Sequence, residues 1–438
     1  MSVKTSRPDV GSGLGETRPE QELPRSDTAV LAGKRVAVVL YSYYETDPRP
    51  RYEAEAMAQA GMEVDVLCLR KDTSRLLRER INGVNVFRLP MRLRRETKLT
   101  YVAQYTGFLL ASLAFVSLRT LRGRYQFVHV HNMPDVLVFS ALLARLLGAK
   151  VVLDLHDPMP ELLQAKYFLP PNHILVRLLR RLEKVSIAFA HQALTPNAAF
   201  KERFVSRSCA PEKIEIVMNS PVARIFHADE ASPAREGPGE REFLLMYHGL
   251  LVERHGLDLA VRAIAKLRER FPQMKLHLYG EPTAYMAEVL QLAQTLNLQN
   301  TVLFHGFKPL DEIAQAIKGI DLGVIPNRLN PFTMINLPTR IFEYLAMKRP
   351  VIAPRTQGIR DYFAEDSLIF FEPGDLDDLT RKIEWVCLHP AEARTTLERG
   401  FAVYRQHQWE QQEKKLLRIL AGLQMKRTNH NFTRGRVG

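Results

Sequence analysis

Residues 337–346 include the side chains best suited to bind an anionic ligand. Pro338 favours the first turn of a helix, because the amide hydrogen that proline lacks would have no partner there. The free N–H groups of this turn, at Thr339 and Arg340, and the positive end of the helix dipole can bind phosphate. Glu343 lies about one helical turn further on, where its carboxylate can accept hydrogen bonds from two neighbouring hydroxyls. A diphosphate at the helix start with a diol nearby predicts a site for a nucleotide sugar.

Loops after predicted strands in the second half of the chain can hold the same ligand, since open α/β sheets bind ligands at the carboxyl ends of their strands. Gly249, Gly280 and Gly306 stand at three such ends, and glycine lets a backbone approach a ligand closely. In the first of these loops Arg254 can clamp phosphate oxygens through two N–H groups. A single glycine after a strand usually marks only a turn, so the prediction depends on all the loops together.

Polar residues also follow strands in the first half of the chain. We assign three of them, Arg49, Arg51 and His131, to binding of the acceptor, the second substrate that would receive the sugar. The two arginines can meet a phosphate on an acceptor, although an ion pair at a helix start explains them equally well. His129 and His131 face the same side of one strand, a spacing that metal ligands can also have. Because the neighbouring carboxylates do not obviously converge on them, we expect no metal site.

These motifs resemble the retaining glycosyltransferases of family 4, the glycosyl transferases of group 1, which have the GT-B fold. The resemblance covers residues 34–423, and Phe342-Glu343-Tyr344-Leu345-Ala346 with Pro350-Val351-Ile352 fits the second half of the family's Glu-x7-Glu motif. It implies that Glu343 binds the nucleotide ribose. It also implies that His156 contacts the donor sugar or the acceptor near the reacting carbon, with Asp157 as a second catalytic candidate. No cofactor is expected beyond the nucleotide-diphosphate sugar, which is a co-substrate.

The position of the motif's first glutamate departs from the family pattern. Ile335 stands there, where the family usually has the glutamate that touches the transferred sugar. Asn336 or Asn327 can supply the missing polar contact.

The phosphate-binding positions depart as well. Leu250 and His255 stand where the family has an arginine and a lysine that grip the phosphates. We therefore expect Arg254, and with less weight Arg340, to bind the diphosphate.

Composition bounds the class of protein. With 438 residues, 46% of them hydrophobic, the chain is globular and long enough for two or three domains. Three scattered cysteines indicate reduced thiols, and residues 1–33 contain no apolar signal core, so we expect a cytoplasmic protein. The net charge of +13 favours an anionic partner. Because the basic residues are spread out and no RNA-binding aromatic motif accompanies them, we expect no nucleic acid partner.

Short β-branched segments alternate with amphipathic ones in two successive series, separated by a Pro- and Gly-containing stretch. This pattern predicts two Rossmann-like, doubly wound α/β domains that face a central cleft, and we expect a C-terminal helix to pack back on the N-terminal domain. The predicted segments are a disordered tail (1–33), an acceptor-binding domain (34–222), a linker (223–241), a nucleotide-sugar-binding domain (242–400), a C-terminal helix (401–425) and a basic tail (426–438).

The uncharged stretch 101–118 approaches the length of a transmembrane helix. It lies inside the first strand–helix series, where a spanning helix would disrupt the sheet. A buried helix and an interfacial helix against anionic lipid remain as alternatives, and the second predicts a peripheral position at the inner face of the membrane. The flanking basic residues are Arg88, Arg92, Arg94, Arg95, Lys98, Arg119, Arg122 and Arg124.

The expected function is metal-independent transfer of a hexosyl unit to a glycan or polyprenyl-phosphate-linked acceptor, in cell-surface or exopolysaccharide assembly. A nucleotide-sugar 2-epimerase of the same fold is an alternative that would need further acid and base carboxylates in the cleft. A nucleic-acid-binding protein and a non-catalytic scaffold with a degenerate site are the remaining alternatives.

Overall fold

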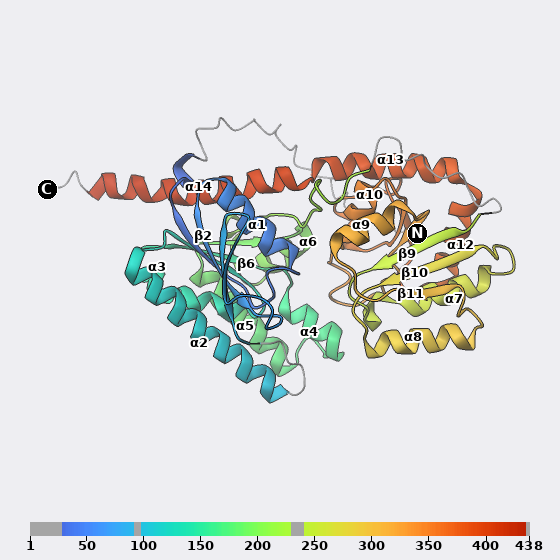
Figure 1. Cartoon of the computed structure of the whole chain (residues 1–438), viewed down its shortest axis with the longest axis horizontal. Coiled ribbons are helices and arrows are strands. Elements are labelled where there is room, and N and C mark those ends of the chain that lie inside the picture. Colours follow the sequence, from blue (N-terminus) through green and yellow to red (C-terminus); the bar gives the residue numbers. More distant parts are fainter. Residues whose placement is uncertain (1–28, 92–97, 229–240, 435–438) are drawn as a thin grey trace, which may run out of the picture.

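The computed structural model describes residues 29–91, 98–228 and 241–434, which form two α/β domains side by side (Figure 1). Each domain is a mostly or wholly parallel β-sheet with helices packed on its faces. The predicted pair of Rossmann-like, doubly wound domains is therefore confirmed.

The N-terminal sheet has eight strands in the order β3-β4-β2-β1-β5-β6-β7-β8. Its strands pair in parallel, except that β3 runs antiparallel to β4 at one edge. Helices cover both faces of the central strands, which explains their nearly continuous apolar sequences. The strands are β1 (Arg35–Val39), β2 (Glu63–Leu69), β3 (Arg78–Ile81), β4 (Val84–Leu89), β5 (Phe127–His131), β6 (Lys150–Asp154), β7 (Gln192–Thr195) and β8 (Ile214–Ile216).

One helical layer of this domain shares a hydrophobic core with the sheet on the face opposite α1 (Pro48–Gln59). In α2 every fourth residue is fully buried, namely Phe108, Ser112, Val116 and Thr120, so one stripe of this helix faces the core. The layer consists of α2 (Lys98–Gly123), the 3-10 helix η2 (Asp135–Ala141), α3 (Leu142–Leu146), α4 (Met159–Tyr167), α5 (Ile174–Phe189) and α6 (Ala198–Val205).

The C-terminal sheet has six parallel strands in the order β11-β10-β9-β12-β13-β14. Its strands are β9 (Phe243–His248), β10 (Met274–Tyr279), β11 (Val302–Phe304), β12 (Leu322–Val324), β13 (Val351–Pro354) and β14 (Ile369–Phe371). Its helices are α7 (Leu257–Leu267), α8 (Ala284–Thr295), α9 (Leu310–Lys318), α10 (Thr339–Ala346), α11 (Gln357–Arg360), α12 (Leu376–Leu388) and α13 (Pro390–Gln406).

In both sheets the strand order reverses beside the first strand of the domain. β1 lies between β2 and β5, and β9 lies between β10 and β12. At such a switch point the connections leave in opposite directions and open a crevice at the carboxyl ends of the strands. The loops after β1, β5, β9 and β12 are thereby brought to the sites where ligands bind.

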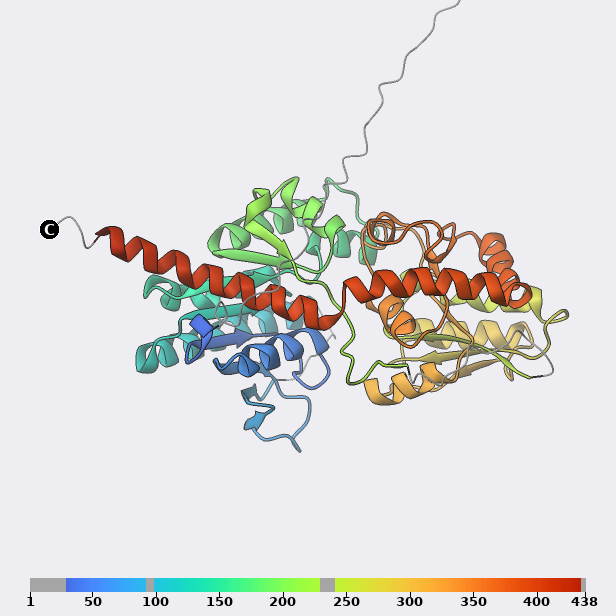
Figure 2. The same ribbon diagram turned by 90° about the horizontal axis from the view of Figure 1, so that it is seen from above.

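The last helix, α14 (Trp409–Arg434), returns to the N-terminal domain, as expected (Figures 1 and 2). Leu416 and Leu420 are fully buried in a core that they share with α1, β1 and β2. The chain therefore crosses between the domains twice, once after β8 and once between α13 and α14. A hydrogen bond of 3.0 Å from the Met218 N–H to Gln412 Oε1 joins the two crossings.

Some local structure differs from the sequence-based expectations. The predicted tail includes Leu31, which is fully buried, and α14 continues to Arg434 through most of the expected basic tail. The segment after β5 forms η2 followed by the short α3 in place of one continuous helix. Strand β3 was missed because its sequence, Arg-Glu-Arg-Ile, lacks an apolar alternation. The predicted basic flank at residues 92–95 lies outside the described residues, as do residues 1–28 and most of the linker.

Candidate functional site

Helix α10 packs its apolar side on the C-terminal sheet and leaves its start and one polar face in the interdomain cleft. The Tyr344 hydroxyl donates to the Met246 carbonyl at 2.8 Å, and the ring fits only because position 323 is glycine, where a Cβ would approach it to 2.5 Å. Pro338 is the N-cap residue, one position earlier than predicted. No side chain of the described residues caps the helix, so the N–H groups of its first turn are available to a ligand.

Glu343 lies in this cleft beside His248, the last residue of β9. Its Oε2 lies 3.2 Å from His248 Nε2, and the two side chains are 13% and 7% exposed. Burial raises the pKa of Glu343 to about 7, an effect that Arg340 opposes. Burial and Arg340 lower the pKa of His248 to about 3. Both groups therefore tend towards neutrality in the free protein, and a ligand that donates hydrogen bonds would favour the ionised form of Glu343.

Arg340 is enclosed by the loop that follows β9. Its guanidinium carbon lies 4.4 Å from the centroid of the Tyr247 ring. Gly249 has φ +117°, and a Cβ at this position would lie 2.8 Å from Arg340 Nη2, so both the backbone and the arginine require glycine. Arg340 Nη1 is buried and has no hydrogen-bond partner among the described residues. An anionic oxygen in the cleft would satisfy it.

Arg254 approaches the N-terminal domain from the opposite side of the same loop, on the 3-10 helix η4 (Glu253–His255). Its guanidinium carbon lies 5.7 Å from the centroid of the Phe332 ring. Burial raises the pKa of Asp157, and the charges of His156 and of Arg254 from the other domain oppose the rise. Arg254 Nε is buried without a hydrogen-bond partner in the part of the chain that the structure describes. Both candidate phosphate ligands thus keep unused donors.

The two departures at the phosphate-binding positions have a structural explanation. His255 is buried, with Nδ1 2.7 Å from the Leu250 carbonyl oxygen and 2.9 Å from the Tyr247 hydroxyl. Burial, with Arg340 and Arg254, lowers its pKa to about 3, so it carries no charge near neutral pH. His255 therefore fixes the shape of the loop, and Leu250 contributes only its carbonyl.

The loop before α10 explains the third departure. Ile335 is 1% exposed and packs, with Phe332, into the hydrophobic core of the N-terminal domain. An apolar side chain at this position thus holds the two domains together. Asn327 and Asn336 line the cleft instead, and Asn327 Oδ1 is buried without a hydrogen-bond partner in residues 29–91, 98–228 and 241–434.

Six of the eight predicted donor residues line one cavity of about 350 Å³ between the domains. Gly280 and Gly306 do not line it. The Gly280 N–H donates to the Gly306 carbonyl at 2.9 Å, and a Cβ at Gly280 would lie 2.1 Å from the Gly249 oxygen, so this pair supports the β9 loop from behind. The polar and glycine residues that line the cavity are His156, Asp157, Asn219, His248, Gly249, Arg254, His255, Asn327, Asn336, Thr339, Arg340 and Glu343.

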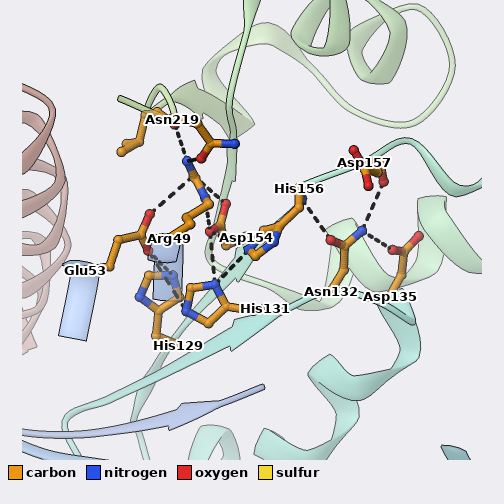
Figure 3. A network of polar contacts seen from close by, with 11 residues as sticks. Arg49, Glu53, His129, His131, Asn132, Asp135, Asp154, His156, Asp157 and Asn219 are labelled. Carbon is orange, nitrogen blue, oxygen red and sulfur yellow. Dashed lines mark hydrogen bonds and ion pairs between the residues drawn. The ribbon is translucent and has the colours of Figure 1, made fainter. Parts of the chain in front are cut away.

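The N-terminal side of the cleft rests on a buried polar network (Figure 3). Arg49 is 6% exposed and donates to both carboxylate oxygens of Asp154, at 2.6 and 2.7 Å. Its remaining nitrogen donates to the Val217 carbonyl and to Asn219 Oδ1. The assignment of Arg49 to an acceptor phosphate is therefore corrected, because all three nitrogens are engaged inside the domain.

Arg51, the second arginine assigned to the acceptor, forms the helix ion pair that was its alternative explanation. Its Nε lies 2.8 Å from Glu55 Oε1, one turn along α1. Neither arginine lines the cavity. Their proximity in sequence to the first switch point indicated an acceptor role, whereas the helix turns both side chains to internal partners.

His156 links the network to the cavity. Its Nε2 lies 3.1 Å from Asp154 Oδ2 and 2.9 Å from His131 Nδ1, and its backbone N–H donates to Asn132 Oδ1 (Figure 3). Burial alone would lower the pKa of His156, but the Asp154 carboxylate raises it. His131 itself is 1% exposed and does not line the cavity, so its assignment to the acceptor is corrected to an internal contact. Only His156 and Asp157 of these predicted residues face the cleft.

The fold and the cleft define a class of protein. Two Rossmann-like domains face each other at their switch points. The C-terminal domain presents the start of a helix, a carboxylate and two arginines with unpaired N–H groups to the cleft. This arrangement is typical of two-domain enzymes that act on nucleotide-linked substrates.

Comparison with known families identifies the class more closely. Residues 47–220 match the family of the glycosyl transferase 4-like domain, and residues 228–403 match the glycosyl transferases group 1. The chain belongs to the group 1 glycosyltransferases, with the GT-B fold, which transfer sugars from nucleotide sugars.

One sequence relative and two solved structures illustrate the family and the fold respectively. An uncharacterised glycosyltransferase of Methanocaldococcus jannaschii is 25% identical over 316 residues, which cover 70% of this chain and 76% of that protein. Sucrose-phosphate synthase from Thermosynechococcus elongatus has a similar structure, with a TM-score of 0.73, 18% identity, and coverage of 89% of this chain and 99% of the other. Anabaena HepE, solved in complex with UDP, has a TM-score of 0.65 at 15% identity, with coverage of 89% and 100%.

Proposed function

We propose that this protein transfers a hexosyl unit, with retention of configuration, from a nucleoside-diphosphate sugar to a glycan carried on polyprenyl phosphate. The reaction would take place at the cytoplasmic face of the membrane during cell-surface or exopolysaccharide assembly. The observation that carries the proposal is the convergence of Arg254, Arg340, Glu343 and the start of α10 in the interdomain cavity.

Each of these groups has a role in binding and activating the donor. The ribose diol donates to Glu343, which is one helical turn from the N–H groups that take the diphosphate. Arg340 and Arg254 use their free N–H groups on the diphosphate oxygens and stabilise the negative charge that builds up as the sugar leaves. Because these cations and the helix start neutralise the diphosphate, the transfer needs no metal ion at that position.

The sugar is held by the segment between β12 and α10 of the C-terminal domain. Asn327, with its unpaired Oδ1, and Asn336 can bind sugar hydroxyls in place of the glutamate that Ile335 replaces. The acceptor hydroxyl enters beside His156 and Asp157 and attacks the face from which the diphosphate departs. A diphosphate oxygen takes its proton, so the configuration is retained without a protein nucleophile.

The surface of the N-terminal domain supports a membrane-bound acceptor. Within the described residues one helix, over residues 102–123 of α2, has the length and composition of a membrane span, but its buried stripe makes it part of the domain. The outer sides of α2, α3 and α5 carry large apolar side chains, which basic residues of α5 accompany. This combination suits an anionic bilayer surface. The most exposed of the apolar residues are Val102, Leu110, Leu121, Leu146, Ile174 and Val185.

The donor is tested by thermal shift against a panel of nucleoside-diphosphate sugars, followed by NMR of the anomeric configuration in the product. One donor should stabilise the protein by mass action and give a retained linkage on a polyprenyl-linked glycan. Release of free nucleotide that is independent of the acceptor would favour the 2-epimerase, and binding without turnover on any acceptor would favour a non-catalytic scaffold.

The membrane surface is tested by co-sedimentation with anionic and zwitterionic vesicles at low and high salt. The wild-type chain should bind anionic vesicles at low salt, and the double variant Leu146→Glu with Ile174→Glu should bind much less. Leu388→Glu, at a residue 47% exposed at the end of α12 in the other domain, is the matched control and should bind like the wild type. Absence of binding of the wild-type chain at low salt would refute the membrane contact.

A further inference from the structure

A second group of titratable side chains lies behind His156, outside the donor cavity. Glu53 on α1, His129 and His131 on β5, and Asp154 at the end of β6 bring one ligand atom each to within 4.8 Å of one another (Figure 3). Three elements far apart in sequence therefore converge on one point. The carboxylates near the two histidines in sequence gave no reason to expect a metal, whereas Glu53 comes from helix α1, more than seventy residues earlier.

Apart from Asp154, the residues of this group keep buried polar atoms without hydrogen-bond partners among the described residues. Glu53 and His129 are fully buried and His131 is 1% exposed. Both oxygens of Glu53, both nitrogens of His129 and Nε2 of His131 have no hydrogen-bond partner among the residues that the structure describes. Leaving a buried polar group unsatisfied costs about 1–3 kcal/mol. Each of these three residues offers one ligand atom to the same small group, so we expect a bound species between them.

We propose that Glu53, His129 and His131 bind a divalent transition-metal ion, with zinc as the best fit. Imidazole nitrogens with a carboxylate oxygen are a ligand set that zinc takes in proteins. Glu53 Oε2 lies 3.4 Å from His129 Nε2 and 4.0 Å from His131 Nε2. In a tetrahedral zinc site with bonds of about 2.1 Å, neighbouring ligand atoms are about 3.4 Å apart, so a small adjustment closes the site.

Asp154 contacts one of the proposed ligands rather than the ion itself. Its Oδ2 lies 3.1 Å from His131 Nδ1, which leaves Nε2 of that ring for the ion. A carboxylate on the second nitrogen of a metal-binding histidine fixes the tautomer and the orientation of the ring. Because Asp154 also contacts His156 Nε2, the ion would hold the position of the histidine that lines the cleft.

The balance of charge also admits a cation. Arg49 is paired with Asp154 through two hydrogen bonds. Its approach to Glu53 is longer, 3.3 Å from Nη2 to Oε1, and is not a hydrogen bond. One arginine is thus shared between two carboxylates, and one negative charge of the three groups remains buried beside two imidazoles. A divalent cation there is coordinated, whereas an unpaired carboxylate would be costly to bury.

The test uses the full, untagged chain. The wild-type protein is incubated with zinc chloride, separated from free metal by gel filtration and analysed by mass spectrometry of the metal. We expect about one zinc per chain, and X-ray absorption with two imidazoles and oxygen in the first shell at about 2.0–2.1 Å. Glu53→Gln and His129→Asn should retain almost none. Glu288→Gln and His389→Asn, at residues outside the network, are the matched controls and should retain the wild-type content.

Other results would overturn the site. A wild-type chain without zinc, together with a Glu53→Gln variant that folds with unchanged melting temperature, would show that Glu53 holds a proton or a water molecule there. A thiolate in the absorption spectrum would place the zinc at a cysteine. If both variants fail to fold, the zinc content and the first shell of the wild-type chain still decide the question.

Discussion

Glu343→Gln should stabilise the ligand-free protein while weakening the nucleotide complex. The wild-type carboxyl group has a pKa of about 7 in the folded chain and an ordinary value of 4.5. Between these values the folded state holds a proton that the unfolded state has lost, so stability falls as the pH rises through this interval. At pH 8 the ionised side chain costs about 3 kcal/mol, and below pH 4.5 it costs nothing. Glutamine carries no charge at any pH and removes this cost.

The assay is thermal unfolding of the wild type and the variant between pH 5 and 8. For a domain of this size about 1 kcal/mol corresponds to about 2–4 °C, so the variant should melt about 5–10 °C higher at pH 8 and nearly with the wild type at pH 5. His248 stays neutral over this range, because its pKa is about 3, and does not contribute to the difference.

The second part of the assay adds UDP at pH 8. Hydrogen bonds to a charged group contribute about 1.5–3 kcal/mol each, so the variant should bind at least about tenfold more weakly. Glu288→Gln, at an exposed residue of α8, is the control for the substitution. A Glu343→Gln protein that is less stable than the wild type at pH 8, or a difference that does not change with pH, would refute the reasoning.

Three further changes follow from the same contacts. Arg340→Met should lower affinity for a nucleoside diphosphate by about 2–3 kcal/mol in calorimetry, and retained affinity would remove the arginine from the diphosphate. Gly249→Ala, where φ is +117° and Cβ would meet Arg340, should lower both thermal stability and nucleotide affinity, by about 1–3 kcal/mol for stability; an unchanged melting temperature would contradict this. Arg49→Ala should destabilise by about 3–5 kcal/mol in urea, because it leaves Asp154 buried and unpaired, whereas Arg51→Ala should cost less than about 1 kcal/mol; equal losses would contradict the two assignments.

The sequence predicted those features of the fold and the site that depend on local sequence pattern. Alternating apolar and amphipathic segments gave two doubly wound domains, and the first turn after Pro338 placed Arg340 and Glu343 on one polar face. Because a glycine or an arginine after a strand lies at a defined end of a parallel sheet, the cavity residues Gly249 and Arg254 could be found without coordinates.

The remaining features depend on tertiary contacts. Nothing near Arg49 in sequence shows that its partner is Asp154, more than a hundred residues later, so an arginine after the first strand looked free for a ligand. Glu53 stands in a helix with ordinary amphipathic surroundings, yet it meets two histidines of another strand. In the sequence, Ile335 is only a position where the glutamate usual in the family is replaced. The packing of the two domains shows that it is a core residue.

The two crossings between the domains restrict how the enzyme can move. A single flexible connection would let the lobes twist, slide and separate. Two covalent connections, joined by the hydrogen bond between Met218 and Gln412, instead define one hinge axis. Rotation of the lobes about this line would widen or narrow the cleft. Because Arg254 and Asp157 belong to different lobes, such a rotation would change their separation, so the last helix influences the cavity although it lies outside it.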